Sequence, residues 1–222
     1  MIDLKSLSTA ERARHLANPD GEIGVAIANS LNVGNKPLYD IVLPRLDMAS
    51  GCEVLEVGFG NGRFVPDLIR LADRVSYRGI DISATMVTEA TQANAALVTS
   101  GVAQFQLGSA GRMPFGDACF DRVFAIGVLH FWQDPAVELA EIRRVLRPGG
   151  MSAVLVIDPR SAGDIAHARP EFGFHLKDGA TLAALHRAAG FGDVSVETIE
   201  SARTRPDGSG FVLYTCVVTA RP

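Results

Sequence analysis

The sequence has few of the features that mark secreted, membrane-spanning or nucleic-acid-binding proteins. Its 222 residues include only three cysteines, far apart, so a disulfide scaffold is not expected and a reducing compartment fits. No run approaches about 18 uncharged apolar residues, and the first twenty positions carry several charges, so neither a membrane span nor a secretory leader is predicted. The 21 basic residues are outnumbered by 25 acidic ones, which argues against nucleic acid or an anionic membrane as partner. These absences predict a cytoplasmic protein.

The composition that remains is that of a folded protein of moderate size. Apolar residues make up 47% of the chain, which excludes a wholly disordered polypeptide. At about 150 residues per domain, the length predicts one domain with an appendage. The pattern changes near residues 49–51, from helical periodicity to alternating strands and helices. We therefore expect a helical segment over residues 1–49, acting as a lid, and one larger domain over residues 50–222.

Several helices are predicted from their start signals. Ser8 and Glu11 form a possible capping box for a helix that ends near residue 17. Apolar residues at helical spacing over 23–31 predict a second helix, and Asn35 followed by Pro37 predicts the start of a third. Further helices are expected over 62–72, from 83 to about 98, from 134 to about 146, and from 178 to about 189.

Short apolar runs between these helices predict the strands of one sheet. Five of them are expected over residues 52–57, 75–81, 102–107, 120–128 and 152–157, and two later β-rich runs over 194–199 and 211–219 suit an antiparallel hairpin. Strands that alternate with helices predict a mostly parallel sheet with helices on both faces. Such sheets bind ligands beyond the carboxyl ends of their strands, so functional residues are sought there.

The first strand ends in a glycine cluster with acidic neighbours. Gly58 and Gly60 permit a tight turn and a close approach of ligand to backbone, although a tight turn with no ligand remains an alternative. Asp81 ends the second strand, where a carboxylate can accept both hydroxyls of a ribose. Glu56 would repel the pyrophosphate of a dinucleotide but favours an ammonium or sulfonium group. The alternative for Glu56 is a buried carboxylate satisfied by backbone N–H groups.

Five motifs follow one another in order along the chain. They are VLEVGFGNG at 54–62, GIDIS at 79–83, MPF at 113–115 followed by Phe120-Asp121, VLHFW at 128–132, and EIRRVLRPGG at 141–150. Together they resemble the motifs of class I S-adenosylmethionine-dependent methyltransferases. The resemblance spans about residues 50–200, and the small-molecule branch that includes the ubiquinone and menaquinone methyltransferases is the most similar. The family fold implied is a Rossmann-like α/β domain with a seven-stranded, mostly parallel sheet, a C-terminal antiparallel hairpin and an N-terminal helical lid.

The resemblance implies S-adenosyl-L-methionine as cofactor and suggests where this chain holds it. Glu56, Gly58 and Gly60 would hold the methionine part and Asp81 the ribose. Adenine would lie between Ile82 and Met86, and Gly127 and Val128 would pass beneath the transferred methyl group. Ser109-Ala110 stands where the family usually has an Asp-Ala pair, so the usual acid that meets the adenine amino group is absent here, although the Ala110 backbone remains able to contact adenine.

Methyl transfer from a sulfonium depends mainly on alignment of the reacting atoms, and no metal-ligand spacing is present. His130 is the best candidate for a general base, and a role in shaping the pocket is an equal alternative. The expected substrate-binding residues are Asn32, Tyr39, Phe131, Trp132 and His175.

We therefore predict a methyltransferase with a small, partly apolar acceptor. Two alternatives remain open at this point, a nicotinamide-dependent oxidoreductase and a non-catalytic module that binds S-adenosylmethionine. The sequence leaves the oligomeric state, the acceptor and the methylated atom open.

Overall fold

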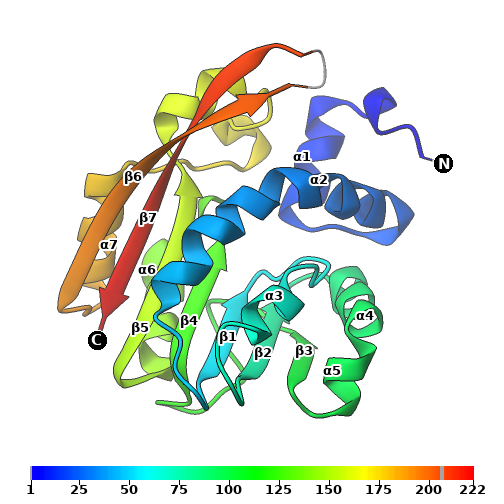
Figure 1. Cartoon of the computed structure of the whole chain (residues 1–222). Helices are drawn as coiled ribbons and strands as arrows, with labels where there is room; N and C mark the ends of the chain where they lie inside the picture. The colour runs from blue at the N-terminus through cyan, green and yellow to red at the C-terminus, as the bar shows by residue number, and fades with distance from the viewer. Residues whose placement is uncertain (1, 206–207) are drawn as a thin grey trace.

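The computed structural model describes residues 2–205 and 208–222, and within them one mixed sheet forms the centre of the molecule (Figure 1). The strands follow the order β3-β2-β1-β4-β5-β7-β6. All neighbours pair in parallel except β7, which is antiparallel to both β5 and β6. The strands are β1 Glu53–Val57, β2 Ser76–Asp81, β3 Ala103–Leu107, β4 Phe120–Ile126, β5 Leu146–Ile157, β6 Asp193–Thr204 and β7 Gly210–Arg221. The predicted fold class is confirmed.

Helices cover both faces of the sheet. Buried side chains of α2, α3 and α4 share one apolar cluster, and those of α6 and α7 share the cluster on the opposite face. The helices are α1 Thr9–Ala17, α2 Gly21–Val42, α3 Val65–Ile69, α4 Ala84–Ala93, α5 Ala95–Thr99, α6 Pro135–Val145 and α7 Gly179–Ala188. Short 3₁₀ turns cover Leu4–Ser6, Leu43–Leu46, Leu129–Phe131, Pro159–Asp164 and Pro170–Phe172. None of the helices in the described ranges has the length and apolar content needed to cross a bilayer.

The period-two alternation of β1 decides which side chains meet which helices. Val54 packs in the cluster shared with α2, whereas Leu55 and Val57 pack in the cluster shared with α6. Glu56 therefore faces the α2 side of the sheet, where it is buried at 2% exposure. An acidic side chain is thus carried into the core by the same alternation that buries its apolar neighbours.

Several helix starts follow the predicted signals. The Ser8 hydroxyl accepts the N–H of Glu11 while the Glu11 carboxylate accepts the N–H of Ser8, so the capping box is present. Ser83 caps α4 by accepting the N–H of Met86 at 3.0 Å. Asp178 caps α7 in the same way. These side chains satisfy N–H groups that have no partner within their helices.

The two helices predicted over residues 23–46 are wrong, because α2 is one helix of 22 residues that contains Pro37. Proline removes one i to i−4 hydrogen bond and leaves the carbonyl of Val33 without its helical donor. Val33 is 85% exposed, so water can reach that turn. The helix ends at Val42, and Pro44 lies in the 3₁₀ turn that follows it.

Other boundaries also differ from the predictions. The helix expected over 62–72 is confined to α3, which has Pro66 in its first turn. The helix expected from 83 to 98 is divided at Asn94, whose side-chain amide donates to the carbonyls of Gly62 and Ala90. The strand expected at 152–157 already begins at Leu146, and β6 and β7 are longer than the predicted hairpin strands. Pairing with neighbouring strands extends these segments beyond their apolar cores.

The N-terminal helices lie across the carboxyl ends of β1, β2 and β4 (Figure 1). The N–H of Gly21 at the start of α2 donates to Thr85 Oγ1 at 3.2 Å. Midway along the helix, Asn29 Oδ1 accepts a hydrogen bond from the Asn61 amide of the glycine loop at 3.1 Å. The residues expected to form a lid are thus joined to the first turn of α4 and to the glycine loop that follows β1. The division into segments 1–49 and 50–222 stays a prediction.

Two leucines on parallel strands test the position of the core. Leu55 of β1 is fully buried, whereas Leu107 of β3 is 58% exposed. We expect Leu55→Ala to lower the free energy of unfolding by about 2–5 kcal/mol, because it leaves a cavity between β1 and α6. Leu107→Ala should change it by no more than about 0.5 kcal/mol. Urea unfolding of both variants measures the difference, and equal losses would contradict the assigned burial.

Candidate active site

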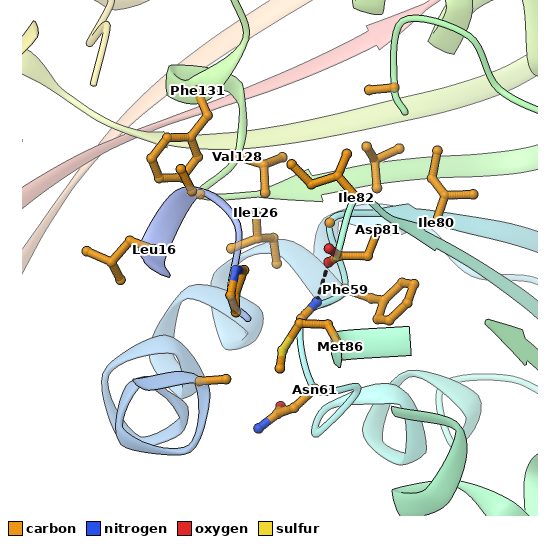
Figure 2. A pocket seen from close by; sticks show the side chains of 18 of the residues that line it. Leu16, Phe59, Asn61, Ile80, Asp81, Ile82, Met86, Ile126, Val128 and Phe131 are labelled. Atoms are coloured by element: carbon orange, nitrogen blue, oxygen red, sulfur yellow. Dashed lines mark hydrogen bonds between the residues drawn. The ribbon is translucent and has the colours of Figure 1, made fainter. Parts of the chain in front are cut away.

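A cavity of about 470 Å³ lies between the strand ends and the N-terminal helices. Figure 2 shows side chains from both sides converging on it, with Asp81, Ile82 and Met86 opposite Leu16. Nine of the ten residues expected to bind the cofactor line this cavity: Gly58, Gly60, Asp81, Ile82, Met86, Ser109, Ala110, Gly127 and Val128. The cavity therefore unites motifs that are up to 70 residues apart in the chain.

The glycine loop has a conformation that side-chain-bearing residues rarely adopt. Gly58 has a φ of +76°, and a Cβ placed on it would lie 2.4 Å from Val128 Cγ1. Only glycine can therefore carry the loop past the end of β4. The backbone N–H of Gly60 donates to Asp81 Oδ2 at 3.0 Å, the contact drawn as a dashed line in Figure 2. The N–H of Ser83 donates to Oδ1 at 2.9 Å.

These contacts orient Asp81 and leave part of its hydrogen-bonding capacity open. An ionised carboxylate has roughly four acceptor positions, and the two N–H groups take one on each oxygen. Burial raises the pKa of Asp81, while the N–H groups of Ser83 and Gly60 lower it. The carboxylate is thus held at the cavity wall with lone pairs free for hydroxyl donors.

Glu56 forms a buried hydrogen-bonded set with two tyrosines. Tyr39 of α2 donates to Oε1 at 2.5 Å, and Tyr77 of β2 donates to Oε2 at 2.7 Å. The register pairs Glu56 with Gly79 on β2, where a Cβ would lie 2.9 Å from the Tyr77 hydroxyl oxygen. Gly79 therefore makes room for Tyr77 to reach the carboxylate. The alternative of satisfaction by backbone N–H groups does not describe Glu56, since both of its donors are phenols.

Burial dominates the ionisation of this set. It raises the pKa of Glu56 to about 7, against the lowering effect of the Tyr39 and Tyr77 hydrogen bonds. Within the described residues, no cationic side chain forms an ion pair with this carboxylate. Glu56 is not part of the cavity wall, whereas Tyr39 is. Glu56 is therefore connected to the cavity through the hydroxyl of Tyr39.

Ile82, Met86 and Ala110 give the cavity an apolar surface. Ile82 follows β2 with 52% exposure, and Met86 is fully buried below it. Ala110 is also buried, and the Ser109 hydroxyl accepts the N–H of Gly111 at 3.3 Å. An exposed isoleucine at a cavity rim is an apolar surface suited to a flat ring.

Four of the five expected substrate-binding residues line the cavity, namely Asn32, Tyr39, Phe131 and Trp132. His175 is not among the lining residues in the described ranges, and its backbone N–H donates to the carbonyl of His130. Asn35, three residues after Asn32 on α2, lines the cavity as well. Helix α2 thus supplies polar groups to the cavity wall.

His130 lies behind the cavity wall. It is 3% exposed and stacks on Phe174 with ring centroids 4.8 Å apart, and its neighbour Phe131 lines the cavity. Burial lowers the pKa of His130 to about 3, and His167 and Lys177 lower it further, so the ring is neutral at physiological pH. This position agrees with the pocket-shaping alternative, because His130 supports Phe131 and does not itself line the described part of the cavity.

Two lining residues carry chemistry that the sequence motifs do not indicate. His15 of α1 lines the cavity from the lid, and Arg14 donates to its Nε2 at 2.9 Å. Burial and Arg14 lower the pKa of His15. Glu138 of α6 lines the end near Ser109. Helical periodicity predicts both helices, but only tertiary packing shows that these two side chains reach the cavity.

The sequence is similar to known methyltransferases. Residues 55–154 match the family described as "Methyltransferase domain". An uncharacterized methyltransferase, YdaC, of Bacillus subtilis is 28% identical over 163 residues, covering 73% of this chain and 84% of that protein. O-methyltransferase resE of Aspergillus sclerotiorum is 32% identical over 173 residues, covering 73% and 63% respectively. The chain spans 38–63% of the length of that protein and two further relatives.

The structure also resembles solved proteins. The crystal structure of the [4+2]-cyclase SpnF superposes with a TM-score of 0.69 at 26% identity, covering 83% of this chain and 80% of that one. Three observations thus agree: the motifs converge on one cavity, the glycine loop contacts the acid of β2, and the sequence matches methyltransferases on both sides of that loop. The matched methyltransferase domain, the methyltransferase relatives and the fold support assignment of the chain to the class I S-adenosylmethionine-dependent methyltransferases.

Proposed function

We propose that the protein transfers a methyl group from S-adenosylmethionine to a hydroxyl group of a small, partly apolar molecule. The observation that carries the proposal is Glu56, a buried carboxylate that has no cationic partner among the described residues and lies beside the glycine loop. A ligand with an ammonium and a sulfonium group supplies the missing positive charge. A dinucleotide would bring an anionic pyrophosphate to the same loop, so the oxidoreductase alternative is disfavoured.

The cavity residues fit the parts of this cofactor. The Tyr39 hydroxyl donates a hydrogen bond to Glu56, so its oxygen is left as an acceptor on the cavity side, suited to an ammonium group. Asp81 has lone pairs free for the two ribose hydroxyls. Ile82 and Met86 offer apolar surface to adenine. We assign Gly58, Gly60, Gly127 and Val128 to the backbone surface on which the methionine part rests.

When bound, S-adenosylmethionine supplies a methyl group that is already activated by its positive sulfur. The chain's own contribution is to bind, orient and exclude water. Val128 forms part of the cavity wall below the acceptor, and Phe131 and Trp132 form an apolar wall beside it. Holding the two reactants in line lowers the activation barrier, because most of the entropy cost of bringing them together is met when they bind. The lid helices complete the enclosure, which keeps water from competing for the methyl group.

A hydroxyl acceptor must lose a proton, and we propose His15 as the group that receives it. His15 lines the acceptor side, and its lowered pKa keeps the ring neutral and able to accept. Its Nε2 accepts a hydrogen bond from the exposed Arg14, and its Nδ1 lies 3.4 Å from the backbone nitrogen of Asp20, so the Arg14 contact must open before Nε2 can take the proton. His130 then acts by holding Phe131 in place. Oxygen as the methylated atom agrees with the relative named as an O-methyltransferase.

Two further expectations belong to this proposal. We place the protein in the cytoplasm because its three cysteines are free thiols, two of them buried. We expect no nucleic-acid partner because the chain has a formal net charge of −4. The sequence also left open a non-catalytic module that binds the cofactor. Only turnover distinguishes such a module from a methyltransferase, that is, formation of S-adenosylhomocysteine in the presence of an acceptor.

The first experiment is calorimetric titration with S-adenosylmethionine, S-adenosylhomocysteine and NADH. We expect binding of the first two and none of the third. Asp81→Ala should weaken S-adenosylhomocysteine binding roughly tenfold or more, because two hydroxyls lose a charged acceptor. Asp73→Ala, an exposed acid of the same βαβ unit, is the matched control and should leave the affinity unchanged. Full affinity in folded Asp81→Ala would refute the ribose assignment, and binding of NADH alone would refute the proposed cofactor.

The pKa of Glu56 gives a second prediction. At pH 6.5 more than half of Glu56 is protonated, because its pKa is raised to about 7. The ammonium group of S-adenosylhomocysteine favours the carboxylate, so binding should release protons at pH 6.5 and affinity should rise with pH until Glu56 is ionised, near pH 8. Calorimetry in buffers of different ionisation enthalpy measures the release. Glu56→Gln should abolish it, and an unchanged release in that variant would assign the proton to another group.

A further inference from the structure

Glu138 has an unusual environment for a carboxylate. It lies in the first turn of α6 and lines the cavity. Its Oε2 is buried, and no described residue donates a hydrogen bond to it. Burial raises the pKa of Glu138 and the nearby Asp134 raises it further, while the backbone N–H of Glu138 itself lowers it, so no other residue compensates the charge. A buried acceptor without a donor costs free energy that a ligand can recover.

The next acid along the same helix shows what a structural carboxylate looks like here. Glu141 accepts hydrogen bonds from Arg144 and from the backbone N–H of Met113. These partners lower the pKa of Glu141. Glu138 is one turn earlier and has none of them. The packing of α6 against the loop that contains Met113 therefore does not explain the orientation of the Glu138 side chain.

Glu138 lies at the end of the cavity formed by residues 108–111. Its Oε1 is 3.6 Å from the position that a Cβ on Gly111 would occupy. Gly111 is joined to Ser109 through the hydrogen bond between its N–H and Oγ, so the hydroxyl of Ser109 already has a donor. Ile82, 52% exposed, lines the same cavity. This end thus combines an apolar surface with one carboxylate oxygen that lacks a hydrogen-bond donor.

We infer that Glu138 accepts a hydrogen bond from the exocyclic amino group of adenine and so selects adenine over other purines. The inference rests on the proposed cofactor, which places adenine beside Ile82. An amino group directed at this end of the cavity supplies the donor that Oε2 lacks. A purine with a carbonyl at this position would present an acceptor to the carboxylate and be rejected. Glu138 thereby occupies, from α6, the place of the acid that is absent at Ser109.

The test compares two ligands on two proteins by calorimetry. The ligands are S-adenosylhomocysteine and its analogue in which hydrogen replaces the adenine amino group. The wild type should bind the analogue roughly tenfold to a hundredfold more weakly, the range expected for a hydrogen bond to a charged group. Glu138→Met keeps the length of the side chain and removes the acceptor. It should bind both ligands with equal affinity, at about the level of the wild type with the analogue.

The outcomes separate this inference from the proposed function. If Glu138→Met still discriminates between the ligands as the wild type does, or if the wild type binds both equally, Glu138 does not contact the amino group. If the wild type binds neither ligand, the proposed cofactor itself fails. Glu200→Met, the same change on the exposed face of β6, should retain the wild-type discrimination. Cooperative thermal unfolding of each variant establishes that it is folded before it is titrated.

Discussion

The hydrogen bonds from Tyr39 and Tyr77 to Glu56 join three parts of the molecule at one buried point. Tyr39 comes from α2, Glu56 from β1 and Tyr77 from β2. Apolar packing alone tolerates small shifts of a helix over a sheet, but hydrogen bonds to a buried carboxylate are directional, and losing one leaves a costly unpaired group. The height and rotation of α2 above the strand ends therefore depend on this set, and the shape of the cavity depends on α2.

The same set couples enclosure of the cavity to its electrostatics. A phenol that donates to a carboxylate becomes a better acceptor on its other side, because hydrogen bonds in series polarise one another. Tyr39 thus transmits negative character from Glu56 to the wall without exposing the carboxylate to water. This surface of Tyr39 is present at the cavity only when α2 is in place. Closure of the cavity by α2 and the negative character of its wall therefore depend on the same hydrogen bond.

The fold could be predicted where local signals and tertiary structure agree. Apolar runs located the strands, and Ser8, Ser83 and Asp178 marked helix starts through caps that the structure contains. Prediction failed at α2, where Pro37 carries the signal of a helix start but packing of the helix over the sheet tolerates one lost hydrogen bond. The cavity-lining residues of the glycine loop and strand ends follow from topology, since parallel strands end at one edge.

Other residues of the site follow from packing that no local pattern encodes. Whether His130 or Phe131 faces the cavity depends on the 3₁₀ turn after β4, which turns the histidine toward Phe174. His15 and Glu138 reach the cavity because α1 and α6 dock where they do. A single histidine or glutamate in an amphipathic helix does not indicate that its side chain lines a cavity. The placement of Glu56 behind the wall likewise depends on two tyrosines that are 38 residues apart in the chain.

The position of β7 has a consequence for how the chain reaches this structure during synthesis. Because β7 lies between β5 and β6, the earlier-made β6 has no neighbour in the sheet until β7 has left the ribosome. Until then β5, most of whose residues are buried in the finished sheet, presents an open hydrogen-bonding edge. The edge of β5 therefore stays unpaired while about sixty further residues are synthesised. During this interval a chaperone, or another copy of the chain, can bind to it.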